Sequence, residues 1–260
     1  MPHQGPHRST RRGRPDTARG DRGRGCGGFR ILRTNRRTVR IRFLGQPFGA
    51  DSQLGQLLLD RLEDQATQRL WIATAWAKRS GLSRIANSVT VLVGRGGTAE
   101  AIIGIDEGGA SLEGLQLAAE LFRPVHVFHD PGPRTFHPKL YVTESQTTAT
   151  AIVGSGNLTK GGLFTNYEAA FALELDLASE DDAQTLASLR AYYEQLLASG
   201  AACQPLDDDL IQHLSEVAVI SSESAQNRGL QRRRARRQES VFGTTVTGLA
   251  GAPAPQIAPA

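Results

Sequence analysis

Two charged or chargeable side chains in the middle of the chain are spaced so that they could act on one group. His137 and Lys139 are two residues apart, and Leu140, Tyr141 and Val142 follow in a run typical of a β-strand. Side chains two apart on a strand lie on the same face. We therefore predict that the imidazole and the ammonium point at the same place.

A second short strand, residues 149–153, is predicted just downstream. It ends in the turn Gly154-Ser155-Gly156-Asn157, which would present a hydroxyl, backbone N–H groups and a carboxamide. A nucleophilic imidazole, a held cation and neutral donors suit a phosphodiester. The cation and donors would bind the non-bridging oxygens while the imidazole attacks phosphorus.

The pattern resembles the signature of the phospholipase D superfamily, H-x-K-x4-D followed by G-S-x-N. It departs from that signature in having Glu144 where the family has aspartate and a somewhat longer gap before the Gly-Ser pair. The resemblance is best over residues 44 to 200. The matching residues are His137, Lys139, Gly154, Ser155 and Asn157.

This resemblance implies roles for further residues. Glu168, eleven residues after Asn157, is at about the place where compact nucleases of the superfamily carry a glutamate that accepts a hydrogen bond from the histidine ring. Ser155 and Gly156 would help bind the substrate. Glu144, near the site, would be structural. The superfamily needs no catalytic metal or other cofactor, so none is expected.

The implied mechanism needs a second histidine. His137 would attack and form a phosphohistidine, with Lys139 and Asn157 binding the phosphoryl oxygens and Glu168 orienting the ring. Another group must protonate the leaving oxygen. Superfamily enzymes pair two His-Lys motifs, but this sequence contains one. A homodimer in which two copies share one active site is therefore expected.

The resemblance also bears on the substrate. Single-motif members resemble nucleases and the nuclease domains of restriction or phage-defence proteins, whereas two-motif members include lipid enzymes. The first hypothesis is a metal-independent nuclease with a role in restriction or defence. One alternative is a phospholipid or other phosphodiester hydrolase or transferase. Another is a non-catalytic module that binds nucleic acid.

The lysine content argues against a chance His-x-Lys on a solvated strand. The chain has only three lysines, Lys78, Lys139 and Lys160, among 30 lysines and arginines. A lysine at the motif position of such a chain indicates that the site requires a compact point charge, which the broad, planar arginine side chain does not supply.

Charge divides the chain into parts. Residues 1–42 hold 13 arginines and two aspartates, and residues 228–260 are also basic, so the net charge of +4 leaves residues 43–227 at −12. We predict a disordered arginine-rich tail (1–42), a catalytic domain (43–200), a C-terminal helix (201–222) and a disordered basic tail (223–260). The first tail is either a nucleic-acid-binding arm or upstream sequence translated from a mis-assigned start.

Composition narrows the class of protein. There is no apolar run of 18 residues and no apolar signal region, so neither a membrane span nor secretion is expected. The two cysteines, Cys26 and Cys203, form no disulfide framework, and a cytoplasmic location is predicted. The Gly94–Gly97 turn lacks the ending of a phosphate loop. A metal cluster is a minor alternative, with ligands His126, His129, Asp130 and His137.

The remaining pattern predicts an α/β fold, a phospholipase D-like mixed sheet between helices. Apolar spacing predicts helices at 51–62, 80–86, 111–121, 180–198 and 207–220. It predicts strands at 40–44, 70–77, 89–93, 100–105, 125–128 and 167–176, in addition to those that carry the motif.

Overall fold

The structure is a computed structural model that describes residues 39–236. Its strands are β1 (Arg40–Gln46), β2 (Arg69–Thr74), β3 (Thr98–Gly104), β4 (Val125–Phe128), β5 (Lys139–Glu144), β6 (Thr148–Gly154), β7 (Glu168–Asp176) and β8 (Cys203–Pro205). Its α-helices are α1 (Leu54–Glu63), α2 (Arg79–Gly94), α3 (Leu112–Leu121), α4 (Glu180–Leu197), α5 (Asp208–Glu216) and α6 (Glu223–Arg236). Single helical turns occur at Ala50–Ser52, Asp106–Gly108, Gly161–Thr165 and Gly200–Ala202.

The strands form one mixed sheet in the order β1-β7-β6-β5-β2-β3-β4-β8. The neighbours β2, β3 and β4 are parallel, and the other pairs are antiparallel. The predicted α/β class with a mixed sheet between helices is confirmed. Because β5, β6 and β7 are consecutive in sequence and in the sheet, the motif strands are direct neighbours.

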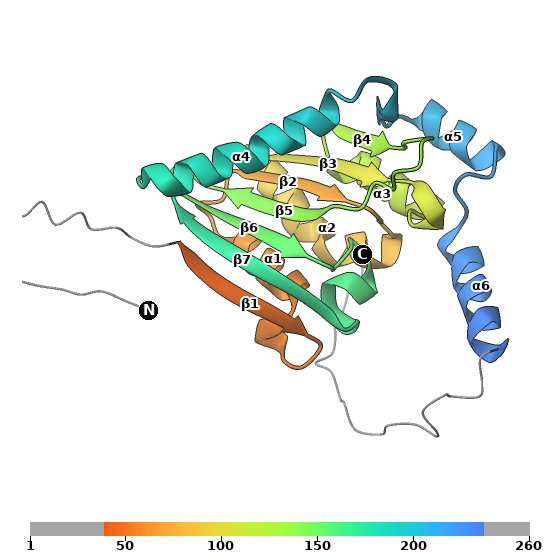
Figure 1. The fold of residues 1–260 in the computed structure, drawn as a ribbon, viewed down its shortest axis with the longest axis horizontal. Helices are drawn as coiled ribbons and strands as arrows, with labels where there is room; N and C mark the ends of the chain where they lie inside the picture. The colour runs from red at the N-terminus through yellow and green to blue at the C-terminus, as the bar shows by residue number, and fades with distance from the viewer. Residues whose placement is uncertain (1–38, 237–260) are drawn as a thin grey trace, which may run out of the picture. The chain divides into compact units, whose positions relative to one another are not determined.

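Helices cover both faces of the sheet, as Figure 1 shows. On one face, α1, α2 and α3 contribute to a core that includes Leu58, Ile85 and Leu115. On the other face α4 lies across the strands and packs Leu186 and Tyr193 into a second apolar cluster. Apolar burial on both faces fixes the register of the central strands.

The prediction for residues 80–93 was wrong. A short helix and a strand were expected, but the structure has one continuous helix, α2. The alternating valines Val89, Val91 and Val93 suggested a strand. The buried residues of α2 instead follow helical spacing, through Leu82, Ile85, Val89 and Leu92, and this packing overrides the weak helix propensity of valine.

The C-terminal part also differs from the prediction. The single helix expected at 201–222 is a short strand, β8, followed by α5, which Asp207 caps by accepting a hydrogen bond from Leu210 N. Residues 223–236, assigned to a disordered tail, form α6. Two bonds anchor its first turn. Glu223 accepts from Ser80 N at 3.1 Å, and Glu113 accepts from Glu223 N at 2.8 Å.

The boundaries of the ends are tested only in part. Strand β1 begins at Arg40, inside the expected N-terminal tail, because it pairs with β7. The rest of that tail, and the basic tail beyond residue 236, lie outside the described residues. Between residues 39 and 236, no helix is both long and apolar enough to cross a membrane.

Candidate active site

The H-x-K segment lies at the start of β5. His137 precedes the strand and is exposed, whereas Lys139 is its first residue and is only 6% exposed. The Lys139 Nζ lies 2.7 Å from both His137 ring nitrogens and donates to the His137 carbonyl at 3.1 Å. The predicted convergence of the two side chains is therefore present in the structure. It gives an accessible imidazole backed by a buried ammonium.

Burial perturbs this ammonium. Loss of water lowers the pKa of Lys139 below its usual value, and the nearby carboxylate of Glu168 raises it by less. Desolvation penalises the charged form of a lysine, while an anion favours it. The second effect shows that the Glu168 carboxylate lies close enough to Lys139 to interact with its charge.

Ser155 and Glu168 are brought together by the pairing of β6 with β7. The Ser155 hydroxyl donates a short hydrogen bond to the Glu168 carboxylate and accepts one from Ala169 N at 3.1 Å. Asn166 donates to the other Glu168 oxygen at 3.2 Å. Both oxygens of this half-buried carboxylate are thus bound by neutral donors.

The expected hydrogen bond between Glu168 and the His137 ring is absent. The lysine ammonium lies against both ring nitrogens, and the carboxylate is bound by Ser155 and Asn166 instead. Glu168 therefore lies close to the motif, but in this structure it supports Ser155 and the charge of Lys139 rather than the imidazole.

The turn after β6 is held by close backbone packing. The Gly156 carbonyl accepts a hydrogen bond of 2.9 Å from the buried Tyr141 hydroxyl, on the β5 residue two after Lys139. A Cβ added at Gly156 would lie 2.4 Å from the Gly162 carbonyl oxygen, so glycine is required there. The sequence interpretation gave Tyr141 no role, although its spacing from Lys139 places both on one strand face.

Asn157 follows in this turn and is half-buried. Its position is set by Leu158, whose N donates to the Trp76 carbonyl and whose carbonyl accepts from Lys78 N, each at 3.0 Å. The amide oxygen of Asn157 is buried and has no hydrogen-bond partner among residues 39–236. A buried polar atom left unpaired costs about 1–3 kcal/mol and needs an explanation. This oxygen is an acceptor, so a phosphoryl oxygen would be bound by the NH2 of the same amide and not by this atom.

Glu144 is not near this cluster, contrary to the prediction. It is the last residue of β5, and five residues of strand span roughly 17 Å. The structural role predicted for it agrees with its contacts, since the buried carboxylate accepts short hydrogen bonds from Trp71 Nε1 and Arg190. It joins β2, β5 and α4 at the opposite end of the strand.

The residues of the alternative metal cluster are dispersed. His126 lies on β4, with its pKa lowered by burial and raised by less by Glu100. His129 pairs with Asp106 at 2.5 Å, and Asp130 pairs with Arg134 at 3.1 Å. Across the described residues no group of three or more His, Cys, Asp or Glu side chains is close enough to hold a metal ion.

The His129–Asp106 pair was missed from the sequence. Asp106 also accepts from Phe136 N at 3.4 Å, so it connects the end of β3 to the segment that leads into His137. No spacing rule joins residues 106 and 129. They meet because β3 and β4 are parallel neighbours whose carboxyl ends lie at one edge of the sheet.

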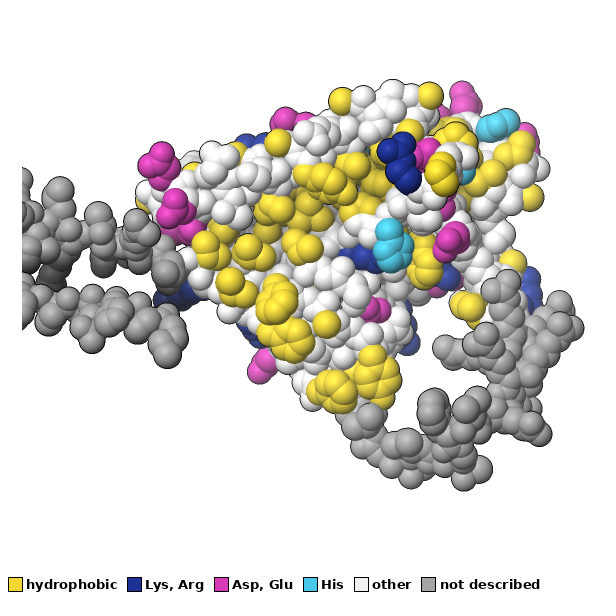
Figure 2. Space-filling model, in the orientation of Figure 1, with side chains coloured by type: hydrophobic (Ala, Val, Ile, Leu, Met, Phe, Trp, Pro, Cys, Tyr) yellow, Lys and Arg dark blue, Asp and Glu magenta, His cyan; other side chains and the backbone are white. Residues whose placement is uncertain are grey.

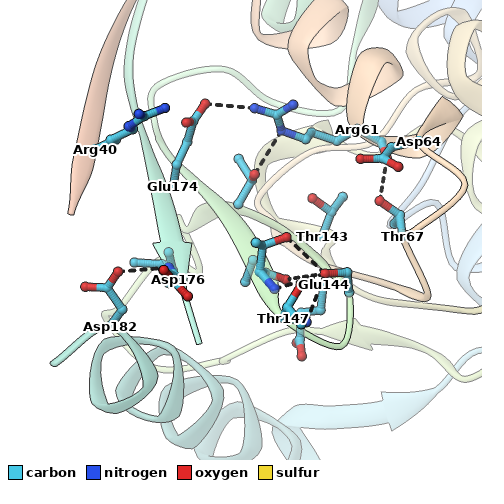
Figure 3. A pocket seen from close by; sticks show the side chains of 15 residues that line it. Arg40, Arg61, Asp64, Thr67, Thr143, Glu144, Thr147, Glu174, Asp176 and Asp182 are labelled. Carbon is cyan, nitrogen blue, oxygen red and sulfur yellow. Dashed lines mark hydrogen bonds and ion pairs between the residues drawn. The ribbon is translucent and has the colours of Figure 1, made fainter. Parts of the chain in front are cut away.

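A separate cavity of about 870 Å³ lies at the Glu144 end of β5, β6 and β7. Figure 3 shows its charged and hydroxyl side chains, with Arg61 reaching Glu174 at 2.8 Å. None of the cluster residues His137, Lys139 and Asn157 lines it. The H-x-K segment lies at the opposite end of β5 from this cavity.

Comparisons with known proteins concern the fold. No family model and no curated protein matches the sequence. Similar solved structures include NucT from Helicobacter pylori, with 16% identity, a TM-score of 0.48, and coverage of 65% of this chain and 100% of NucT. Nuc from Salmonella typhimurium has 17% identity and a TM-score of 0.47, covering 66% and 100%. Phosphatidylserine synthase from Haemophilus influenzae Rd KW20 has 15% identity and a TM-score of 0.47, and the match covers 69% of this chain and 45% of the synthase. Nuc is described as a phospholipase D family member, and the motif of this chain resembles that superfamily.

Proposed function

We propose that the protein is a metal-independent phosphodiesterase, and specifically a nuclease. The observation that carries this proposal is the exposed His137 imidazole with the buried Lys139 ammonium 2.7 Å from its ring nitrogens. A cation held at this place can bind a non-bridging phosphate oxygen as the imidazole attacks.

The reaction proceeds in two displacements. A ring nitrogen of His137 forms a bond to phosphorus, the bond to the leaving oxygen breaks, and an acid protonates that oxygen. Water then attacks phosphorus and gives a proton to the acid that was deprotonated in the first step, the N–P bond breaks, and the histidine is regenerated. Lys139 and the Asn157 amide stabilise the charge that grows on the phosphoryl oxygens in both steps. Ser155, which donates a hydrogen bond to Glu168, is proposed to help bind the substrate.

The acid in the first step is assigned to His137 of a second copy. One imidazole cannot attack phosphorus and donate a proton in the same step. The rival within this chain is His129, whose Nδ1 is paired with Asp106, the carboxylate that also accepts from Phe136 N just before His137. The second His137 is preferred because the resemblance implies two H-x-K motifs at one site. A homodimer that shares one active site resolves this.

Nucleic acid is the proposed substrate class. The basic ends of the sequence carry the positive charge, since residues 43–227 are acidic overall. Such ends attract a polyanion to a domain that would otherwise repel it. A role in restriction or phage defence is part of this proposal.

The test is cleavage of plasmid DNA, single-stranded DNA and RNA in excess EDTA. Wild type is compared with His137→Ala and with His213→Ala, which removes an exposed histidine of α5. We expect chelator-resistant cleavage by wild type and His213→Ala alone. Cleavage abolished by EDTA would refute the mechanism. Cleavage of only a small diester or a phospholipid would keep the chemistry and replace the substrate.

A titration tests the shared site. Subunits carrying His137→Ala are co-refolded with wild type at increasing ratios. If each reaction needs both histidines, activity falls with the square of the wild-type fraction. A linear fall would show that each subunit acts alone.

A further inference from the structure

Two exposed aromatic side chains lie together at the end of the sheet where β5 begins. Phe48 follows the end of β1, and Tyr167 immediately precedes Glu168, the first residue of β7 and the partner of the last residue of β1. We call Phe48 and Tyr167 the ring pair. They are 63% and 65% exposed, among the most exposed large apolar residues between 39 and 236. Figure 2 shows hydrophobic side chains gathered at the lower edge of this view, where β1 ends and β7 begins. Large apolar side chains that are exposed together often mark a binding surface.

The ring pair has a fixed place beside the candidate active site. The two ring centroids are 5.8 Å apart and the planes are tilted by 53°, within the range of favourable aromatic pairs. The buried Gln46 side chain, just before the turn that carries Phe48, donates to the Gly162 carbonyl at 3.0 Å. Gly162 in turn packs against the backbone of Asn157, where an added Cβ would lie 2.4 Å from the Asn157 nitrogen. The segment that carries one ring is therefore attached to the turn of the site.

The distance from the site to the ring pair is that of a few nucleotides. In the sheet β7 is two strands from β5 and β1 is three strands from it, which correspond to roughly 10 and 14 Å. A stacked nucleic-acid strand rises ~3.4 Å per nucleotide, so a base about three or four nucleotides from the scissile phosphate reaches the rings. An extended strand reaches them with fewer nucleotides, whereas a small diester does not reach them.

The charges around the ring pair favour a neutral base at this place. The Glu168 carboxylate beside the rings would repel a phosphate. Positive charge for the backbone is available at Lys139 and at the exposed Arg42, whose guanidinium donates to a backbone carbonyl of the turn that follows Phe48. Proteins that bind single strands combine cations along the backbone with aromatic rings on which the bases stack.

We propose that the ring pair is a base-stacking subsite for single-stranded nucleic acid, with the scissile phosphate of the same strand at His137. This rests on the proposed function and narrows its substrate class. In a duplex the faces of the bases are covered by their neighbours, so the rings contact an unstacked base only in a single strand or at a frayed end. Phe48 and Tyr167 position the substrate and touch no reacting atom.

The test removes the rings one at a time in the full chain. Phe48→Ala and Tyr167→Ala each delete a ring, and Tyr167→Phe keeps the ring without its hydroxyl. Phe43→Ala is the matched control, because Phe43 is 59% exposed and packs against another ring at 5.5 Å, but lies three residues before the end of β1, roughly 10 Å back along the strand. Circular dichroism checks folding, and Phe48→Leu, which keeps apolar bulk without an aromatic face, replaces any alanine variant that unfolds.

Binding and cleavage are measured separately. Fluorescence anisotropy of a labelled oligothymidylate, and of a blunt duplex of the same length, gives affinity in a His137→Ala background that cuts neither strand. Cleavage of the oligothymidylate and of bis(p-nitrophenyl) phosphate is measured with His137 intact. The small diester reports on the reaction without the ring pair.

We expect each alanine variant to weaken oligothymidylate binding by at least about 5-fold, and the double variant by up to roughly 150-fold, as at other stacking rings. KM for oligothymidylate cleavage should rise in parallel, with kcat unchanged, because the contact is the same in ground and transition states. Cleavage of bis(p-nitrophenyl) phosphate should not change. Tyr167→Phe and Phe43→Ala should bind within about twofold of wild type, since stacking uses the ring face of the subsite.

Several outcomes would overturn the inference. One is oligothymidylate affinity and KM that stay at the wild-type values in the alanine variants. Another is an equal loss on the duplex or on the small diester, which would show that the substitutions disturb the site itself. A lower mass of the alanine variants in sedimentation velocity would identify the rings as a protein interface instead. A wild type that binds the oligonucleotide through the rings but cleaves no diester would keep the subsite and refute the proposed function.

Discussion

Replacing Lys139 with methionine should remove diester cleavage and at the same time stabilise the fold. Methionine is close to lysine in length and keeps the apolar contacts of the buried stem. It removes the ammonium that lies 2.7 Å from the His137 ring nitrogens. Loss of one preorganised donor to a transition-state oxyanion commonly costs 100- to 1000-fold in kcat.

The expected gain in stability follows from the pKa of the ammonium. Burial lowers the pKa of Lys139, so the native state holds its proton less tightly than the unfolded chain does. The penalty is fully present below the native pKa and is relieved as pH rises towards the ordinary lysine pKa of about 10.4. At neutral pH the variant should therefore be more stable than wild type and unfold at a higher Tm.

Thermal unfolding of wild type, Lys139→Met and the exposed-lysine control Lys160→Met is followed from pH 7 to 10. The control should match wild type in Tm and activity. The difference in Tm between Lys139→Met and wild type should narrow as pH rises. A lower Tm for Lys139→Met at pH 7 would show that the ammonium stabilises the fold. Cleavage within tenfold of wild type would refute its place in the reaction.

Three further substitutions test the site and its supports. Gly156→Ala puts a methyl group 2.4 Å from a backbone oxygen and should cost about 2–4 kcal/mol in urea denaturation, whereas Gly94→Ala, with no atom within 4 Å, should be neutral or slightly stabilising. His129→Ala should keep the rate of diester cleavage within about threefold of wild type, because the proposal assigns the general acid to another residue. A loss of ~100-fold or more in a pH–rate assay would identify His129 as the general acid. Glu144→Ala leaves buried donors unpaired and should cost about 2–4 kcal/mol of stability, with kcat of the remaining folded protein unchanged because the residue is at the far end of β5.

The parts of the site that could be predicted from the sequence are those carried by hairpins. His137 and Lys139 share a strand face by simple alternation, and β6 and β7 return the chain beside β5 within thirty or so residues. Ser155 and Glu168 meet for the same reason. The partner of Glu168 was predicted wrongly because strand pairing fixes where a carboxylate lies, but not which of several donors reaches it first.

Two failures concern helices. In α2 the valines suggested a strand because β-branched residues at alternate positions fit both periods, and only the packing of Leu82, Ile85 and Leu92 against the sheet decides between them. In α6 the polar composition predicted no structure. Hydrogen bonds of Glu223 with Ser80 and Glu113 position the first turn of α6. These residues are far apart in the sequence, so no local pattern predicts the contacts.

Features set by sheet order lie beyond sequence reasoning of this kind. Asp106 reaches His129 because two parallel strands joined by α3 lie side by side. The exposed pair Phe43 and Phe171 exists because β1 pairs with β7, which brings together residues separated by more than half of the described chain. On its own, β1 alternates apolar and polar residues like any half-buried strand. The side chains of Ile41 and Phe43 on β1 stay exposed because α4 packs over other strands of the sheet. The same sheet order that brings the motif together on three consecutive strands thus leaves Phe43 and Phe171 uncovered on β1 and β7.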